Sequence, residues 1–469
     1  MTGLALRVRR SLVRFAVVAA SVAASAGVVG PRASQPADAA PRRANILIIV
    51  TDDQPIGTLA VMPKTRRIFR RGGTEFTNGY VTTPLCCPSR ATILTGRYAH
   101  NHGVRTQEPQ QFDARSSFPR YLARAGYQNA IVGKYLNRWG SSPGYLPPSP
   151  PYFDKWATTR PNPPSGFYDT VFNVNGSYRT IERYSTGYIR DKAVQFVRAF
   201  EKSDSRPWML YVAPVAPHLP AIPAPVYRGA PLPPWRGNPS VFESDKSDKP
   251  PFVRAAQATF SSGRWVRARQ LRSLMSVDDL IGDLFRELGR LGEGRTTLAI
   301  FISDNGFLWA DHGLVNKTVP YTRSIRLPLL MRWPGRVPAG VRDPRFAANV
   351  DIAPTVLHAA GVGPDRPMDG KSLLRSWRRR HMFVEYFRGD TAEAPTWGSV
   401  RTGRAQYVEY YDDGGSVVFR EYYDLQEDPW QLTNLLGDLE ATNDPSPIEL
   451  AELSERIRAG STCSGATCP

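Results

Sequence analysis

Cysteine is scarce in this chain: only four of its 469 residues are cysteine, and two of them, Cys86 and Cys87, are adjacent. After a short apolar stretch near the N-terminus, no hydrophobic run approaches the roughly 20 residues that a membrane-spanning helix needs. We therefore expect no stable membrane insertion. The hydrophobic content of 41% and the aromatic content of 11% are typical of a globular protein rather than a disordered one. The length allows one large domain and a smaller one.

Positive charge is in excess, with a formal net charge of +18. The five arginines among the first 39 residues account for only part of it, and the rest is scattered without an extended basic tract, as in residues 377–381. A basic surface favours anionic partners, namely nucleic acid, acidic lipid, or a sulfated or phosphorylated polymer. Plain solubility is the alternative.

The N-terminus resembles an export signal. Residues 7–14 are arginine-rich, residues 15–29 are apolar and small, and Ala37-Asp38-Ala39 suits a cleavage site. We predict a signal peptide at residues 1–39, either of the Sec type or, because of the Arg9-Arg10 pair, of the twin-arginine type. The mature protein would be secreted, periplasmic or held at the cell surface. An oxidising compartment would then suit a small terminal disulfide between Cys463 and Cys468.

Four short, β-branched apolar runs predict buried strands of a mainly parallel sheet in an α/β fold. They start at Ala44, Asn129, Trp208 and Thr297, and each is followed by polar residues that can carry chemistry. Ligands of open α/β sheets bind beyond the carboxyl ends of the strands. The sequence therefore predicts an active site that includes Asp52, Asp53, Lys134, His218, Asp304 and Asn305.

The remaining pattern predicts the surroundings of that sheet. Residues 267–292 have the apolar spacing of a buried helix face. The proline-rich stretches 143–164 and 214–251 are expected to be ordered rim loops. Residues 401–425 read as antiparallel strands with a turn at 412–415. We predict a catalytic α/β domain over 40–380 and a small C-terminal domain over 381–469.

The acidic and amide residues at the strand ends offer only oxygen ligands. Three carboxylates at one sheet edge repel one another unless a hard cation lies between them, so Ca²⁺, or alternatively Mg²⁺, is expected at Asp52, Asp53, Asp304 and Asn305. The alternative is that these are separate turn and cap residues.

Arg90, Lys134, His218 and Lys317 supply positive charge and proton donors, which suit a transferring sulfate or phosphate. Each residue, taken alone, also suits a structural role. None of these motifs contains a Gly-x-Ser-x-Gly nucleophile elbow. The cysteine pair is the remaining candidate nucleophile, although it could instead form a strained disulfide or pack in the core.

Cys86-Cys87-Pro88-Ser89-Arg90, followed by Thr95-Gly96-Arg97, resembles the signature of the formylglycine-dependent sulfatases of the alkaline phosphatase superfamily. The resemblance implies that a formylglycine-generating enzyme oxidises Cys86 to formylglycine, with Cys87 at the variable position. One oxygen of the hydrated aldehyde would bind the metal and attack sulfur, and the other would expel sulfate.

The resemblance extends from Asn45 to about Leu436 and implies an alkaline-phosphatase-like α/β domain with a small C-terminal sheet domain. It implies a metal site formed by Asp52, Asp53, Cys86, Asp304 and Asn305. Arg90 would brace the formylglycine, and Lys134, His218 and Lys317 would contact the sulfate. No nucleic-acid partner is expected.

One position departs from the family pattern. Leu136 stands where many members have a histidine two residues after the lysine, which leaves the proton acceptor open, with Asn137 or His312 as candidates. This variant is similar to the N-acetylglucosamine-6-sulfatase and heparan sulfatase branch.

The expected substrate is a sulfated sugar such as N-acetylglucosamine 6-sulfate in a glycosaminoglycan, with Trp139, Tyr145 and Trp309 as ring-stacking or simple packing residues. The alternatives are a phosphodiester or phosphonate monoester hydrolase, or an inactive protein that binds sulfated glycans.

Overall fold

A computed structural model describes Met1 and residues 43–140, 149–160, 166–203, 205–389 and 394–469. The predicted signal peptide, apart from Met1, and Tyr145 lie outside these described residues. Within the described ranges, no helix combines the length and the apolar character that crossing a bilayer requires.

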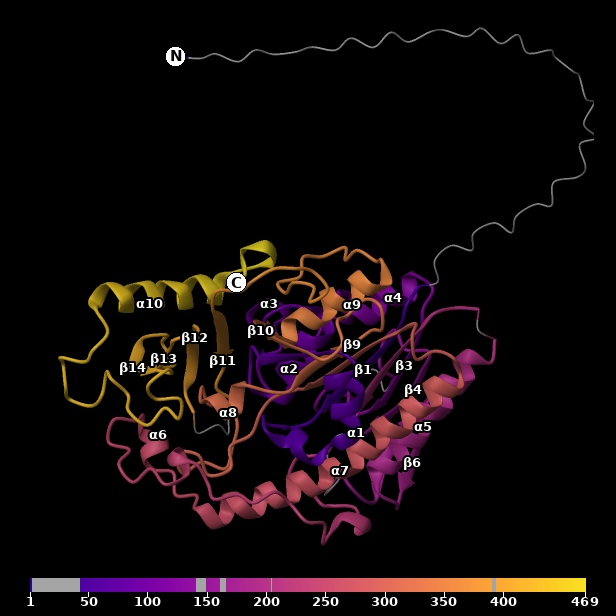
Figure 1. Cartoon of the computed structure of the whole chain (residues 1–469), viewed down its shortest axis with the longest axis horizontal. Helices are drawn as coiled ribbons and strands as arrows, with labels where there is room; N and C mark the ends of the chain where they lie inside the picture. Colours follow the sequence, from indigo (N-terminus) through magenta and orange to yellow (C-terminus); the bar gives the residue numbers. More distant parts are fainter. Residues whose placement is uncertain (2–42, 141–148, 161–165, 204, 390–393) are drawn as a thin grey trace, which may run out of the picture. The chain divides into compact units, whose positions relative to one another are not determined.

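A ten-stranded sheet forms the larger part of the structure, with the strand order β10-β2-β9-β8-β1-β7-β3-β4-β5-β6 (Figure 1). The adjacent strands β8, β1, β7, β3 and β4 are mutually parallel, whereas β9, β5 and β6 run antiparallel to their neighbours. This arrangement confirms the predicted α/β fold with a mainly parallel sheet. The strands are β1 (Asn45–Thr51), β2 (Thr74–Tyr80), β3 (Gln128–Gly133), β4 (Lys155–Thr159), β5 (Thr170–Val174), β6 (Ser177–Ile181), β7 (Trp208–Ala213), β8 (Thr297–Ser303), β9 (Leu329–Arg332) and β10 (Val341–Ala348).

Helices cover both faces of this sheet, as the sequence of β1 requires. Ile46, Ile48 and Val50 belong to one apolar core, and Leu47 and Ile49 belong to the other, because successive side chains of a strand point to opposite faces. The first core includes residues of α2 (Cys86–Thr95), α4 (Phe118–Arg124) and α9 (Ile352–Ala360). The second includes residues of α5 (Ser185–Glu201) and α7 (Phe260–Arg290) (Figure 1). The short helices are α1 (Pro63–Thr65), α3 (Ala99–His102), α6 (Pro251–Arg254) and α8 (Thr322–Ile325).

Helix α7 covers residues 267–290 of the helix predicted over 267–292, and it starts earlier, at Phe260. Thr259 and Ser262 form a capping box, in which the Ser262 Oγ accepts a hydrogen bond from the Thr259 N–H at 2.9 Å. The cap lies upstream of the apolar pattern, which is why that pattern alone placed the start too late.

Four antiparallel strands form a second sheet, in the order β11-β12-β13-β14. These strands are β11 (Met382–Tyr386), β12 (Thr396–Arg401), β13 (Ala405–Tyr411) and β14 (Val417–Asp424), and α10 (Pro447–Thr462) follows them. A disulfide joins Cys463 to Cys468. Phe383 and Trp397 belong to the same apolar core as Ile46, so both sheets contribute to one core, and the domain division at residue 381 stays a prediction.

The two proline-rich stretches differ from each other. The expectation of a rim loop over 143–164 is wrong for residues 155–159, which form β4 and pair in parallel with β3. This pairing satisfies backbone groups of β3 that would otherwise lie at an open edge. The other stretch, 214–251, is an ordered connection that contains only single turns of 3₁₀ helix, at Pro225–Tyr227 and Pro239–Val241, before α6 begins.

Candidate active site

The carboxyl ends of β1 and β8 bring three carboxylates together. Asp52 and Asp53 follow β1, and Asp304 follows β8, whose last residue, Ser303, is level with Thr51 of β1. The Asp304 N–H donates to the Thr51 carbonyl at 3.0 Å. One side-chain oxygen from each of Asp52, Asp53 and Asp304 lies within 4.8 Å of the others. The register of the two strands therefore sets the spacing of the acidic cluster.

The backbone at Asp53 is in the left-handed region, with a φ of 66°, which is uncommon for a residue other than glycine. Two hydrogen bonds hold this turn, from the Asp53 N–H to Asp304 Oδ1 at 3.0 Å and from the Gln54 N–H to Ser303 Oγ at 2.9 Å. A strained backbone conformation persists only where its surroundings enforce it. The turn fixes the direction of the Asp53 side chain.

Asn305 completes the acidic cluster. Its Nδ2 donates to Asp53 Oδ1 at 2.7 Å and to the Gly306 carbonyl at 2.8 Å. Its Oδ1 is buried and has no hydrogen-bond partner among the described residues. Buried polar atoms are normally paired, so this orphaned oxygen fits a ligand for a cation. The donor set of three carboxylates and one amide oxygen suits a hard divalent ion.

Helix α2 carries the cysteine motif and begins at Cys86. Pro88 is tolerated there because the first turn of a helix leaves its N–H groups unpaired. Cys86 and Arg90 lie four residues apart and thus share one face, whereas Cys87 and Ala91, on the adjacent face, belong to the apolar core. Arg90 donates from Nε to Asp304 Oδ2 at 2.8 Å and from Nη1 to the Lys134 carbonyl at 2.9 Å.

Two lysines connect the position of Cys86 with the carboxylates. Lys317 Nζ lies 2.9 Å from Cys86 Sγ and also forms an ion pair with Asp53. Lys134 Nζ lies 2.7 Å from Asp52 Oδ2, and Asp52 Oδ1 is 3.5 Å from Cys86 Sγ. The structure thus brings together Asp52, Asp53, Cys86, Arg90, Lys134, Asp304, Asn305 and Lys317.

His218 lies at the outer side of this group, with its Nε2 3.7 Å from Asp53 Oδ2. Its Nδ1 lies 2.6 Å from the Leu219 carbonyl, and a carbonyl only accepts, so Nδ1 carries the proton. The His218 side chain is 37% exposed, whereas that of Asp53 is 1% exposed. A ligand that enters from solvent therefore meets His218 before the carboxylates.

Burial and neighbouring charges shift the pKa values of Asp52, Asp304 and Cys86 in different directions. Burial raises the pKa of Asp52, but the positive charges of Lys134, His218, Arg90 and Lys317 outweigh it and hold the pKa well below its usual range. Burial, reinforced by the neighbouring charge of Asp52, raises the pKa of Asp304. Burial also raises the pKa of the Cys86 thiol to about 12, despite Lys134 and Lys317. An unmodified Cys86 is thus a thiol at neutral pH, a poor nucleophile.

Some residues that support the site carry no recognisable motif. Gln270 of α7 donates to the Asp53 carbonyl at 3.3 Å and accepts from Trp309 Nε1 at 2.6 Å. Ser89 Oγ donates to the Asp304 carbonyl and accepts from Asn349 Nδ2 at 3.0 Å. A signal for Gln270 was present, because it interrupts the apolar stripe between Val266 and Leu274. Nothing in the sequence around Asn349 indicates its contact.

Other candidates lie outside the cluster or serve packing. His312 shares a hydrogen bond of 2.7 Å with Glu243 and packs on the ring of Tyr321, so its ring is engaged in a structural contact. Leu136 is buried in the apolar core, and the backbone of Asn137 interacts with the Cys87 thiol. Trp139 packs edge-on against Tyr135, and Trp309 against Trp235. With exposures of 8% and 4%, neither ring offers a face for stacking on a sugar, so packing is the correct reading for both.

A cavity of about 1000 Å³ adjoins the site, with Lys317 in its wall. Other lining residues are Gln107, Glu108, Arg138, Asn316 and Tyr386. Gln107 Oε1 accepts from the Cys87 N–H at 3.1 Å, and Arg138 forms an ion pair with Glu108. The cavity is polar, contacts the first turn of α2, and is large enough for a sugar residue.

Two models of known protein families match this chain. The family model described as Sulfatase matches residues 44–362, which hold every residue of the cluster. The chain belongs to the sulfatase family. A second model, described as N-sulphoglucosamine sulphohydrolase, C-terminal, matches residues 310–456. The enzyme class predicted from the sequence, a sulfuric ester hydrolase, is therefore confirmed.

The curated relatives of this sulfatase include N-acetylglucosamine-6-sulfatases and extracellular sulfatase homologs. It is 31% identical to N-acetylglucosamine-6-sulfatase of Homo sapiens, over 91% of this chain and 86% of that protein. It is 27% identical to N-acetylglucosamine-6-O-sulfatase of Bacteroides thetaiotaomicron, over 85% of this chain and 84% of that protein. Extracellular sulfatase homologs of Caenorhabditis elegans and Drosophila melanogaster are 36% and 33% identical over 72% and 71% of this chain, which spans only 50% and 31% of their lengths.

Solved structures share the fold of this sulfatase. A protein in complex with its substrate D-glucosamine-2-N,6-O-disulfate superposes with a TM-score of 0.74 at 24% identity, over 89% of this chain and 97% of that one. Phosphonate monoester hydrolase of Agrobacterium radiobacter gives 0.71 at 21% identity, over 89% and 96%. The predicted alkaline-phosphatase-like fold is thus confirmed.

Proposed function

We propose that this sulfatase is exported and removes the 6-O-sulfate of glucosamine-type residues in a glycosaminoglycan, with Cys86 matured to formylglycine and one divalent cation at the acidic cluster. The observation that carries the proposal is the position of Cys86, which starts α2 beside Asp52 and Lys317 within an intact Cys-x-Pro-Ser-Arg motif. The names of the human and Bacteroides relatives support the 6-sulfated sugar, and those of the extracellular homologs support export.

The residues present fit the implied cation. Asp52, Asp53, Asp304 and the orphaned Oδ1 of Asn305 would hold it, together with an oxygen at position 86. When bound, a Ca²⁺ or Mg²⁺ ion supplies Lewis acidity to the nucleophile and to the ester oxygens. The all-oxygen donor set favours either of these ions over Zn²⁺ or copper, which select histidine and cysteine.

In this proposal, Cys86 must be converted to formylglycine before residue 86 can act as the nucleophile. The high pKa of the buried thiol leaves little thiolate at neutral pH, whereas a hydrated aldehyde at the same place offers hydroxyl oxygens beside Asp52 and Lys317. Such a side chain supplies both an attacking oxygen and a second hydroxyl that can expel sulfate. Arg90, fixed on Asp304 from the same helix face, keeps position 86 directed at the carboxylates.

Lys134, Lys317 and His218 bind and orient the sulfate group. Their side chains are 14%, 10% and 37% exposed, so they are more accessible than the buried carboxylates, and Lys317 also lines the cavity. Ammonium groups fixed by ion pairs to Asp52 and Asp53 present N–H donors where the sulfate oxygens gain negative charge. His218 Nε2 is the ring atom free to exchange a proton with a bound ester, because Nδ1–H is occupied by Leu219. Leu136, an apolar core residue, has no group that could exchange a proton.

The test is a panel of defined substrates for the purified, mature enzyme. We expect hydrolysis of an aryl sulfate and of oligosaccharides that end in N-acetylglucosamine 6-sulfate, and no comparable turnover of matched 2-O-sulfated oligosaccharides or an aryl phosphodiester. Faster turnover of the phosphodiester would refute the proposed reaction, and equal turnover of the 2-O-sulfate would refute the proposed substrate.

A further inference from the structure

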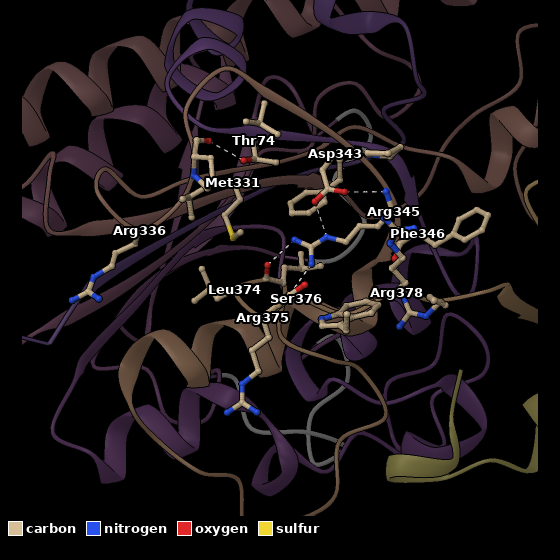
Figure 2. A pocket seen from close by; sticks show the side chains of 18 residues that line it. Thr74, Met331, Arg336, Asp343, Arg345, Phe346, Leu374, Arg375, Ser376 and Arg378 are labelled. Atoms are coloured by element: carbon tan, nitrogen blue, oxygen red, sulfur yellow. Dashed lines mark hydrogen bonds and ion pairs between the residues drawn. The ribbon is translucent and has the colours of Figure 1, made fainter. Parts of the chain in front are cut away.

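A second cavity, of about 600 Å³, is lined by residues of β2, β9 and β10 and by residues 373–379 (Figure 2). Thr74, at the start of β2, lines this cavity. Across the sheet, Thr74 is level with Met331 of β9 and Ile300 of β8. Ile300 is in turn level with Ile48 of β1. Ile48 precedes Asp52 by four residues. At about 3.3 Å per residue and 4.8 Å per strand, the cavity lies on the order of 20 Å from the carboxylates. It is thus separate from the catalytic site.

Arginines line this cavity. The guanidinium of Arg345 occupies its middle, where Asp343 pairs with it at 2.8 Å and the carbonyls of Leu373 and Arg375 accept from it at 2.9 and 2.8 Å (Figure 2). Arg336, Arg375 and Arg378 surround it with exposed side chains that form no ion pair with a carboxylate among the described residues. The only carboxylate in the lining, Asp343, is already paired with Arg345.

A third cavity, of about 590 Å³, continues the arginine-rich surface on the other side of the start of β10. Gly340 and Arg342 line the third cavity, whereas Val341 and Asp343 line the second, as the alternation of a strand requires. Its wall also contains Arg66, Arg67, Arg70 and Arg71. Glu75 pairs with Arg70 at 2.8 Å and with Arg342 at 3.3 Å. Arg67 and Arg71 are exposed and have no carboxylate partner within the described ranges.

We infer that Arg67, Arg71, Arg336, Arg375 and Arg378, here termed the β10 basic surface, bind a sulfated polysaccharide chain outside the active site. The two cavities together carry five arginine charges that no carboxylate of the described residues neutralises. The planar fork of arginine donates two hydrogen bonds to one oxyanion. Two cavities on either side of one strand suit a polymer with repeated anionic groups better than a single small anion.

Single-stranded nucleic acid binds by stacking its bases on exposed aromatic rings. The aromatic residues Phe76 and Trp377 in the second cavity do not offer such a platform. Phe76 is buried, and the guanidinium of Arg345 lies over its ring at 5.1 Å and over that of Trp377 at 5.7 Å. Phe76 is thus closed to a base, and Trp377, which is half-buried, already has the guanidinium groups of Arg345 and Arg379 against its ring. A second contact point would also raise the effective concentration of the chain at the active site without a new catalytic group.

The experiment measures binding and turnover separately. In a Cys86→Ala background, a size-defined heparin oligosaccharide is titrated into the otherwise native protein and into a variant with Arg67→Ser, Arg71→Ser, Arg375→Ser and Arg378→Ser. We expect at least tenfold weaker binding by the variant and a salt dependence reduced by roughly one unit of slope for each lost contact. The same four substitutions with Cys86 intact should leave the turnover of a small aryl sulfate within about twofold, since none of these residues contacts the catalytic cluster.

The matched control removes Arg456 and Arg458 of α10 and is compared with a variant lacking only Arg375 and Arg378. Equal weakening by both double variants would overturn the inference, because net charge alone would then explain the binding. An unchanged dissociation constant in the fourfold variant would also overturn it. So would equally tight binding of single-stranded DNA of matched charge through the same arginines. Failure of the proposed reaction is distinguishable, because it would abolish aryl sulfate turnover in every protein and leave the binding difference intact.

Discussion

Lys317 Nζ lies 2.9 Å from Cys86 Sγ, although 231 positions separate the two residues in the chain. The same ammonium pairs with Asp53, so Lys317 joins Cys86, the proposed nucleophile position, to the acidic cluster. Burial lowers the pKa of Lys317, but the neighbouring Asp53 carboxylate outweighs burial and raises the pKa, which keeps the lysine charged.

Replacing Lys317 by Met should therefore lower kcat for an aryl sulfate by roughly 100-fold or more, with a smaller change in KM, because a fixed donor to the developing charge is lost. Steady-state kinetics measures both constants. Lys202→Met, at an exposed position after α5, is the control and should change neither. A kcat within threefold of the native value would exclude a catalytic role for Lys317.

The two adjacent cysteines should behave differently. Cys86 faces the carboxylates, whereas Cys87 packs in the apolar core. Cys86→Ala should abolish detectable turnover, while Cys87→Ala should keep kcat within about threefold and lower the free energy of unfolding by about 1 kcal/mol through a small cavity. Equal losses of activity would contradict the assignment. In the active enzyme, the mass of the peptide with residue 86 should be lower by one sulfur and two hydrogens and higher by one oxygen.

Removal of divalent ions should both inactivate and destabilise the enzyme. The three carboxylates of the cluster offer ligand oxygens to the ion, and a ligand at 100 times its Kd stabilises the folded state by about 3 kcal/mol. Chelation should lower the melting temperature, and Ca²⁺ or Mg²⁺ should restore it. Asn305→Ala should weaken the dependence of melting temperature on ion concentration, since it removes the orphaned Oδ1. Identical ion titrations for both proteins would argue against a metal at this position.

His102 should make the fold sensitive to acid. Its Nδ1 accepts from the Val104 N–H at 3.1 Å and its Nε2 lies 3.0 Å from Thr92 Oγ1, so the ring is neutral. Burial, helped by the charges of Arg97 and His100, lowers the pKa of His102 to about 3. Between that value and the usual 6.5, only the unfolded state binds the proton, so stability falls as the pH drops through this window.

Urea unfolding at pH 7 and pH 5 measures this effect. Native protein should lose about 2 kcal/mol between the two pH values through His102 alone, and His102→Gln should show a correspondingly smaller loss, whatever its absolute stability. His100→Gln is a control, because it should change the pH dependence of stability in the opposite direction to His102→Gln. Burial lowers the pKa of His100, but hydrogen bonding to Glu385 outweighs it and raises the pKa. His100 therefore stabilises the fold below pH 6.5, and this contribution is lost as the pH rises through its raised pKa.

The strands that lead to the candidate site were predictable because each is an apolar run followed directly by polar residues. Each of β1, β3, β7 and β8 is an apolar run that ends in polar residues, and all four lie side by side in the sheet. The strands β9 and β10 were not predicted. β9 has only four residues, and β10 contains Asp343, Pro344 and two arginines, which do not alternate with apolar residues.

Site residues with a motif lie together in one cluster, as the strand ends indicated, and their catalytic and metal-binding roles stay predictions. Supporting residues were not foreseen. Gln270 and Asn349 reach the site from a helix and a turn that the sequence marks only as structural. The roles of Trp139 and Trp309 also depended on tertiary packing, since an aromatic residue near a catalytic loop has the same sequence signature whether it is buried or open. The supporting contacts are set by the packing of distant segments.

The pairing of β1 with β8 determines when the acidic cluster can form during folding. Asp52 precedes Thr297, where β8 begins, by more than half the length of the chain, so a nascent polypeptide that stops before this strand lacks one side of the acidic cluster. Contacts between such distant segments form slowly because closing a long loop costs entropy before any contact compensates for it. The acidic cluster is therefore complete only after nearly two thirds of the polypeptide has been synthesised, and its formation should occur at a late, cooperative stage of folding.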